Sequence, residues 1–411
     1  MKTKTFQPGD LIQLKTKTRE WQGHALQSHD PEIILLKLSS GYNIGIRESE
    51  ILDTKILEPH SQVKPTHPHP NTPTSQQLPN VAFVITGGTI SSRLDPKSGG
   101  AIPTDAESIL TIAPELKKIC NPIIESPFMK LSENMDPKDW QEIAKICEKY
   151  LNDDSISGVI VTHGSDTLHY TGAALHYFLQ DLNKPVALTF SQRSIDRAST
   201  DAHLNLIAAA KYATSDIAEV ALIGHETTSD ETCIAIPGNS ARKMHTSKRN
   251  TFKPINTIPL ARITKDKFEI LKEFKARDNS RKVKLDTKYQ NKVTSIKVHP
   301  GRDPAIIDFY LEQGYKGLII ETTGLGHVPT KDSSFNWLPK IKKAIDAGMT
   351  ICATAQTIYG TLNPNVYSAG RDLQKTGIIF LPETSETALV KLGWVLGHKQ
   401  WNKSQKMKEN F

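Results

Sequence analysis

The chain has few cysteines, and none is spaced as in a disulfide framework or a zinc site. Its four cysteines are Cys120, Cys147, Cys233 and Cys352, and no C-x-x-C pair occurs among them. Zinc ribbons need such pairs, and small secreted proteins need dense, even sets of cysteines. The sequence therefore predicts free thiols in a reducing compartment and no bound metal.

Long apolar runs are absent as well. A membrane-spanning helix takes about 20 mostly apolar residues, and no run in this sequence approaches that length. The basic start Met1-Lys2-Thr3-Lys4 leads into no apolar signal-peptide core. We therefore expect a cytoplasmic protein that makes no contact with a membrane.

Several catalytic motifs are also missing. The sequence has no G-x-x-x-x-G-K-[ST] phosphate loop, no H-E-x-x-H zinc motif and no G-x-S-x-G nucleophile elbow. No cysteine lies in a turn beside a histidine, which argues against a cysteine nucleophile. The run Gly-Leu-Gly at residues 324–326 lacks the further glycine of a dinucleotide loop. A glycine-rich loop on the substrate side is an equal interpretation of it.

The composition is that of a globular protein with an excess of positive charge. Of 411 residues, 37% are hydrophobic and 23% charged, and the net charge is +7. A chain of this length is expected to form two or three domains. Basic residues gather in 242–292 and 398–408. They form a solvated face, the interpretation that we favour, or the tail contacts RNA.

A proline-rich stretch at residues 59–80 separates two kinds of pattern. It holds six of the 24 prolines and no aromatic residue, so it buries too little apolar surface to fold and is expected to be a semi-rigid spacer. Before it, residues 1–58 contain short apolar runs, with Tyr42, Ile44 and Ile46 in strict alternation. That pattern predicts a small β-barrel module with a binding or docking role.

After the spacer, apolar strands alternate with helices. Such alternation is typical of βαβ units and of a mainly parallel sheet covered on both faces. A helix is predicted at residues 136–151, with Asp136 as its cap and Pro137 in its first turn. The predicted strands are residues 81–86, 158–162, 185–190, 219–224, 293–298, 317–321 and 350–353, and a final helix lies near residues 386–396.

These elements divide into two α/β units. A large domain is predicted at residues 81–275 and a smaller one at residues 293–411. The charged, weakly apolar residues 276–292 are predicted to connect them.

Two of the strands end in turns rich in glycine and hydroxyl groups. Thr-Gly-Gly-Thr-Ile occupies residues 86–90, and His-Gly-Ser-Asp-Thr occupies residues 163–167. Because ligands bind beyond the carboxyl ends of parallel strands, Thr89, Ser165 and Asp166 are expected to share a site. The glycines let the backbone approach a substrate and direct amides at a developing oxyanion. The first turn alone is equally a strand-to-helix turn with a threonine cap, but Asp166 at a buried strand end needs a partner.

A lysine at Lys243, in the run Ala-Arg-Lys-Met-His-Thr-Ser at residues 241–247, would supply that partner. A hydroxyl is a poor nucleophile until a neighbouring base takes its proton, and a desolvated lysine can act as that base. An alcohol, a lysine and an aspartate that positions the lysine are together what amide hydrolysis requires. Taken by itself, Lys243 would be one more surface cation beside Arg242 and Arg249.

Both turns resemble the two signatures of the L-asparaginase/glutaminase family. The resemblance covers roughly residues 81–398 and includes the runs at 355–356, 367–371 and 382–388. It implies a two-domain α/β amidohydrolase. The residues to which it assigns roles are the nucleophilic threonine Thr89, the second hydroxyl Ser165, the aspartate Asp166, the lysine Lys243, the substrate contacts Ser132 and Glu133, and the glycines Gly88 and Gly164 beside the substrate.

The loop after the first signature departs from the family. Members usually carry a tyrosine there, and residues 93–100 have none. How the active-site lid closes therefore stays open. Ser165 keeps the hydroxyl of the family's second threonine and loses only its methyl group.

Within the family, the β module, the spacer and the runs at 131–135 and 242–249 resemble the D subunits of archaeal glutamyl-tRNA(Gln) amidotransferases. This resemblance implies a subunit that releases ammonia from glutamine or asparagine. A partner, the amidotransferase E subunit, would use ATP with Mg²⁺ and that ammonia to convert misacylated Glu-tRNA(Gln) to Gln-tRNA(Gln). No cofactor is then expected in this chain, which would form a homodimer within a heterotetramer.

Two other functions stay open. A free-standing type I L-asparaginase would work without a partner and would not need residues 1–58. A non-catalytic scaffold or RNA-binding protein would tolerate loss of Thr89 or Lys243. The preference between glutamine and asparagine, the order of attack by the two hydroxyls and the contact with tRNA stay open as well.

Overall fold

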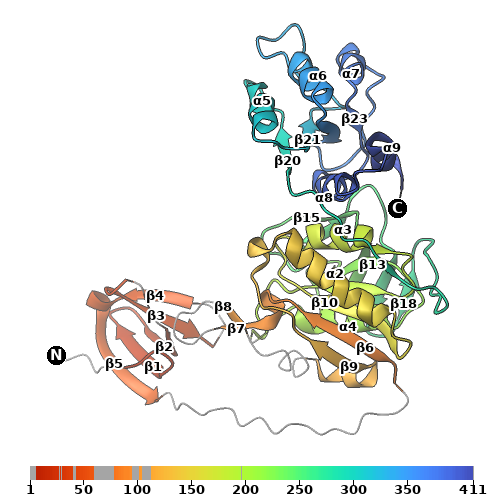
Figure 1. Cartoon of the computed structure of the whole chain (residues 1–411). Helices are drawn as coiled ribbons and strands as arrows, with labels where there is room; N and C mark the ends of the chain where they lie inside the picture. The colour runs from red at the N-terminus through yellow and green to blue at the C-terminus, as the bar shows by residue number, and fades with distance from the viewer. Residues whose placement is uncertain are drawn as a thin grey trace.

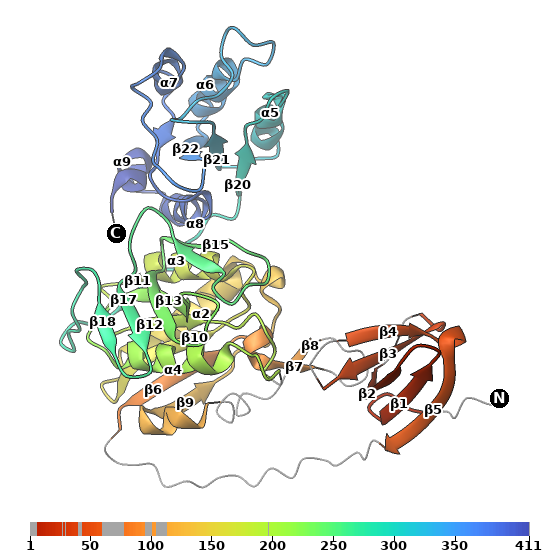
Figure 2. The same ribbon diagram turned by 180° about the vertical axis from the view of Figure 1, so that it is seen from behind.

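Three sheets organise the molecule. The structure is a computed structural model and describes residues 6–26, 28, 30–39, 43–59, 78–94, 101–103, 113–195 and 197–410. An N-terminal sheet stands to one side of two stacked α/β units (Figures 1 and 2). The two α/β units with an added β module confirm the predicted fold class. The exact boundaries of the units stay a prediction, and residues 60–77 of the spacer lie outside the described part.

Short strands form the five-stranded N-terminal sheet, in the order β4-β3-β2-β1-β5 with antiparallel neighbours. Its inward side chains, such as Ile12, Leu14 and Leu36, make a small core of their own. The sheet curls around that core and its hydrogen-bonded order ends at β4 and β5. Its elements are β1 (Leu11–Thr16), β2 (Glu20–Leu26), β3 (Ile33–Leu38), β4 (Asn43–Arg47), η1 (Glu48–Glu50) and β5 (Ile51–Glu58).

An eight-stranded sheet in the order β18-β17-β14-β13-β12-β10-β6-β9 forms the larger unit. The strands from β9 to β13 are parallel, as predicted, whereas β14, β17 and β18 extend the sheet in antiparallel fashion. The strands are β6 (Asn80–Ile85), β9 (Asn121–Glu125), β10 (Ile156–Thr162), β12 (Val186–Thr189), β13 (Val220–His225), β14 (Thr232–Pro237), β17 (Ala261–Thr264) and β18 (Phe268–Ile270).

Helices cover both faces of this sheet because its strands are apolar on both sides. In β6, Ala82 and Val84 pack towards α2 (Pro137–Leu151) and α3 (Leu168–Phe178), and Phe83 packs with α4 (Ala202–Ala213) on the other face. The predicted start of α2 is confirmed, since Asp136 accepts from the amide of Lys138 in a capping box.

Shorter elements complete the larger unit. A pair of strands carries Lys243, and another pair ties residues 284–285 of the predicted connector to the end of α3. They are η2 (Thr89–Ser91), β7 (Ser92–Leu94), β8 (Ala101–Pro103), η3 (Pro114–Lys118), η4 (Ser132–Asn134), β11 (Leu179–Gln180), β15 (Ala241–Lys243), β16 (Phe252–Pro254) and β19 (Lys284–Leu285).

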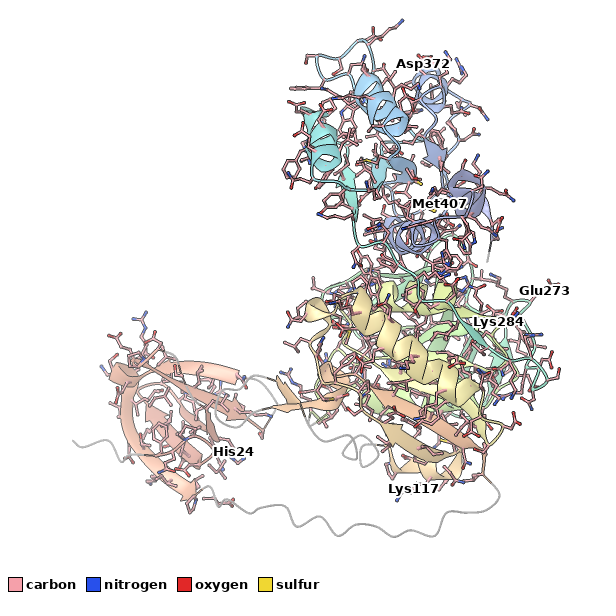
Figure 3. All side chains as sticks on the ribbon, viewed as in Figure 1. His24, Lys117, Glu273, Lys284, Asp372 and Met407 are labelled. Atoms are coloured by element: carbon pink, nitrogen blue, oxygen red, sulfur yellow. The ribbon has the colours of Figure 1, made fainter. Side chains whose placement is uncertain are left out.

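A parallel four-stranded sheet, β20-β21-β22-β23, forms the smaller unit. One face packs on α5 and α6, and α8 covers the other, between this sheet and α3 of the larger unit (Figure 1). The side chain of Met407 on α9 is buried there as well (Figure 3). The elements are β20 (Val293–Lys297), α5 (Ala305–Glu312), β21 (Gly317–Thr322), α6 (Leu338–Asp346), β22 (Thr350–Ala355), α7 (Ser368–Gln374), β23 (Ile379–Phe380), α8 (Ser385–Leu396) and α9 (Lys403–Lys408).

Candidate active site

Two neighbouring parallel strands bring the two glycine turns to one edge of the large sheet. β6 and β10 pair in register, with Ile85 opposite Thr162. At the edge, Thr86 donates to the carbonyl oxygen of Thr162 from its amide at 3.2 Å and from its hydroxyl at 2.8 Å. These hydrogen bonds fix the point at which the first turn leaves the sheet.

Glycines let three segments touch backbone to backbone. Gly88 has a φ of +80°, and a Cβ on it would lie 2.3 Å from the amide nitrogen of Gly164. A Cβ on Gly164 would in turn lie 2.7 Å from Oγ of Ser132. Since no other residue fits these contacts, the glycines hold Thr89, the residue after Gly88, close to the second turn.

The second turn meets β15 through Lys243. Nζ of Lys243 donates to Oγ of Ser165 at 2.9 Å and to Oδ1 of Asp166 at 2.7 Å. The lysine side chain is 12% exposed, so it is largely desolvated. The contact joins residues 77 and 78 positions apart in the sequence, and it places a cation, a carboxylate and a hydroxyl at one point.

The expectation of a buried carboxylate at Asp166 is wrong. Its side chain is 64% exposed, because the residue stands in the turn beyond the strand end and not within the strand. The partner that it needed is nevertheless present. The cation of the pair is the sheltered member and the carboxylate is the one open to solvent.

Ser132 supports the second turn from the side of η4. Its Oγ accepts from the amide of Asp166 at 3.2 Å, and its carbonyl oxygen accepts from the hydroxyl of Thr167 at 2.7 Å. Ser132 is buried, whereas the neighbouring Glu133 is exposed. The structure thus gives Ser132 a role in holding Asp166 in addition to the substrate contact that the resemblance assigns to it.

Thr89 lies at the start of η2 and is partly exposed. In the part of the chain that the structure describes, no hydrogen bond joins Thr89 to Ser165, Asp166 or Lys243. The lid residues 95–100 lie outside the described residues, and so does any account of their closure.

His163 is a functional residue that sequence analysis left without a role. It is fully buried, and burial lowers its pKa to about 4. Its Nδ1 bonds the carbonyl oxygen of Gly164 at 2.7 Å, and Nε2 bonds the hydroxyl of Thr171 at 2.8 Å. The neutral ring therefore fixes the conformation of the turn, and its place directly after an apolar strand was the available signal.

Arg242 is a second residue that the sequence did not single out. It forms an ion pair with Glu386 on α8 at 3.1 Å, across the seam between the two units. Sequence analysis missed it because Arg242 looks like any surface cation and its partner lies 144 positions away, the difference between residues 386 and 242. No group of three or more His, Cys, Asp or Glu side chains among the described residues is arranged to hold a metal ion.

The described helices are also too short or too polar for any of them to cross a bilayer.

Family models match three stretches of the chain. The model for "Asparaginase, N-terminal" matches residues 80–276, and the "Glutaminase/Asparaginase C-terminal domain" matches residues 292–411. The "GatD N-terminal domain" matches residues 6–57.

Similar proteins carry one name. The glutamyl-tRNA(Gln) amidotransferase D subunit of Pyrococcus furiosus is 40% identical over 411 residues, which cover 97% of this chain and 92% of that protein. The Thermococcus kodakarensis protein of the same name is 43% identical over 373 residues, covering 89% and 83% of the two chains.

Solved structures show the same fold. The thermostable L-asparaginase from Thermococcus kodakarensis superimposes with a TM-score of 0.72 at 25% identity, over 80% of this chain and 97% of that one. L-asparaginase I from Vibrio cholerae gives 0.70 at 26% identity, over 81% and 98%.

Proposed function

The chain belongs to the family of glutamyl-tRNA(Gln) amidotransferase D subunits, and we propose that it releases ammonia from glutamine with Thr89, Ser165, Asp166 and Lys243. Membership in the family makes it a glutaminase-type subunit of a tRNA-dependent amidotransferase. The residues that carry the chemistry, the partner and the substrates belong to the proposal.

One observation carries the assignment of residues. Lys243 reaches the hydroxyl of Ser165 and the carboxylate of Asp166 at once, within 2.9 Å. A surface cation needs no such arrangement. A lysine that is held by a carboxylate, shielded from water and hydrogen-bonded to an alcohol is placed to accept a proton.

The reaction that this arrangement supports has two stages. The hydroxyl of Thr89 attacks the side-chain carbonyl carbon of glutamine, and its proton passes by way of Ser165 to Lys243. The C–N bond then breaks, and ammonia leaves with that proton. Water hydrolyses the resulting ester, which releases glutamate and restores Thr89.

Binding falls to the residues around this centre. Ser132 and Glu133 on η4 are the contacts for the α-carboxylate and α-amino groups of the substrate. Gly88 and Gly164 leave room for the substrate against the backbone, since neither has a side chain. Glutamine or asparagine fits this description.

The ammonia serves a second subunit. We expect the amidotransferase E subunit to bind ATP with Mg²⁺ and misacylated Glu-tRNA(Gln), and this chain to hold no cofactor. Two copies of the chain would join two partner subunits in the cytoplasm, without contact to a membrane. Support comes from the name that the relatives share.

The test is a comparison of amide donors. The chain is mixed with the E subunit, ATP and Glu-tRNA(Gln), and Gln-tRNA(Gln) formation is measured with glutamine, asparagine or ammonium. Thr89→Ala is expected to abolish the reaction with glutamine and to leave the reaction with ammonium intact, because the second site does not use Thr89.

Ser91→Ala is the matched control, because it removes another hydroxyl from the same turn, η2. It is expected to retain the reaction with glutamine. Loss of both reactions in Thr89→Ala would mean that the residue is structural. Robust asparagine hydrolysis by the chain alone would favour a free-standing L-asparaginase, the function of the solved structures that it resembles.

A further inference from the structure

We propose that Glu386 is a positioning residue for Lys243, acting through its ion pair with Arg242, so that the smaller unit takes part in catalysis. The inference rests on the proposed function. It starts from the place of α8, which lies between the small sheet and the top of the large unit in both views (Figures 1 and 2).

Helix α8 contacts both elements next to the reactive groups. It packs on α3, which begins two residues after Asp166, and Trp394 stacks on Tyr177 with ring centroids 5.4 Å apart. It also reaches the turn before β15, where the hydroxyl of Thr387 donates to the carbonyl oxygen of Asn239 at 2.9 Å. The helix thus braces the segments that carry the aspartate and the lysine.

Strand β15 needs such a brace. It has three residues and pairs only with β16, outside the large sheet. Isolated two-stranded pairs are marginally stable, so the orientation of Lys243 depends on tertiary contacts. The residue directly before Lys243 provides one, because Arg242 bonds Oε1 of Glu386 at 3.1 Å.

The surroundings of this pair favour a fixed geometry. Arg242 is 27% and Glu386 12% exposed, so both are largely out of water. Glu386 lies in the first turn of α8, where the helix dipole stabilises a carboxylate. Loss of the carboxylate would leave the Arg242 cation poorly solvated beside a second cation, which strongly favours movement of β15.

The test compares two variants that each break an ion pair of the smaller unit, in the complex with the E subunit. Glu386→Gln breaks the pair that crosses to β15. Glu383→Gln breaks a buried pair with Lys391, 2.6 Å long, within the smaller unit. Glutamine hydrolysis (kcat and KM) and the melting temperature are measured for both.

Glu386→Gln is expected to lower kcat by roughly 10- to 100-fold, with KM within about two-fold, because a displaced base slows the chemical step more than binding. Glu383→Gln is expected to lower the melting temperature while kcat stays within about two-fold, since its pair makes no contact with β15. A loss of kcat that follows the melting temperature equally in both variants would overturn the proposal.

Arg242→Gln and the double variant keep the proposal testable if Glu386→Gln folds poorly. If the pair acts as a unit, the double variant is no slower than the slower single variant. Additive losses would show that the two residues act independently and would refute the pair. A wild-type complex that hydrolyses no glutamine refutes the proposed function itself, whereas an active wild type with an unchanged Glu386→Gln refutes only this inference.

Discussion

The carboxyl edges of the two α/β sheets carry the same device. In the large sheet the buried hydroxyl of Thr86 donates to the carbonyl oxygen of Thr162 at 2.8 Å. In the small sheet the buried hydroxyl of Thr322 donates to that of Thr354 at 2.9 Å. Each threonine ends its strand by satisfying a carbonyl group of its neighbour, as buried polar groups must be.

Beyond that point the two edges differ. At the small sheet, Gln356 donates to the carbonyl oxygens of Val298 at 2.7 Å and Glu321 at 3.2 Å, so its amide is used to close the structure. At the large sheet, Lys243 arrives from outside the sheet and meets a hydroxyl and an exposed carboxylate. An edge of this kind therefore becomes a site when a distant segment adds charge that the edge itself does not neutralise.

The largest expected effect separates the two edges directly. Lys243→Met should lower glutamine hydrolysis by roughly 10,000-fold, because the proton acceptor is lost. Gln356→Ala, the change at the other edge, should reduce the melting temperature and leave kcat within about two-fold, because a structural amide takes no part in chemistry. Ammonia release and thermal melts measure the two effects, and near-normal turnover of Lys243→Met would remove the lysine from the mechanism.

The carboxylate is next in size. Asp166→Asn should slow hydrolysis by roughly 1,000-fold, since the amide does not hold the lysine as a carboxylate does. Asp154→Asn is the control, because it breaks an exposed pair with Lys282, 3.0 Å long, in the same unit. Surface pairs contribute little, so its kcat should not change. Equal effects of the two substitutions would refute the relay.

Glycine contacts give a smaller contrast. Gly88→Ala forces a Cβ to within 2.3 Å of the Gly164 amide nitrogen, and the shift should cost roughly 100-fold in kcat. Gly348→Ala in the smaller unit has a similar φ, +93°, and no atom within 4 Å. It should cost about 1 kcal/mol of stability and no activity. Normal kinetics of Gly88→Ala would contradict the close approach of the two turns.

The smallest effect is a pH dependence of stability. Burial lowers the pKa of His163 to about 4 and that of His169 to about 3. Between about pH 6.5 and 4 the unfolded chain binds protons that the folded chain does not, so stability falls as pH falls, by about 2 kcal/mol per histidine at pH 5.

His169→Phe should therefore flatten the loss of stability on acidification, because it removes one of these neutral rings. Melts at pH 7 and pH 5 measure the difference. His203→Gln changes an exposed histidine on α4, 44% accessible, and should leave the slope unchanged. An unaltered slope in His169→Phe would mean that other groups control acid stability.

Local patterns were sufficient for much of the fold. Alternating strand and helix periods predicted β6, β10, β12, β13 and the parallel strands of the smaller unit, and Asp136 marked the start of α2. These signals are local, since capping and apolar periodicity act within a few residues. The antiparallel strands β14, β17 and β18 were missed, because their place in the sheet depends on pairing partners far along the chain.

The sequence by itself determined that two glycine turns follow apolar strands, that a hydroxyl, an aspartate and a lysine are available, and that glycines allow close contact. Only the tertiary structure decided that Lys243 meets Ser165 and Asp166, that Asp166 is open to solvent, and that α8 braces β15 through Arg242 and Glu386. The reason is physical. Short-range preferences shape turns and helices, whereas contacts between segments 77 or more residues apart form only when the cores of both units bury their apolar faces.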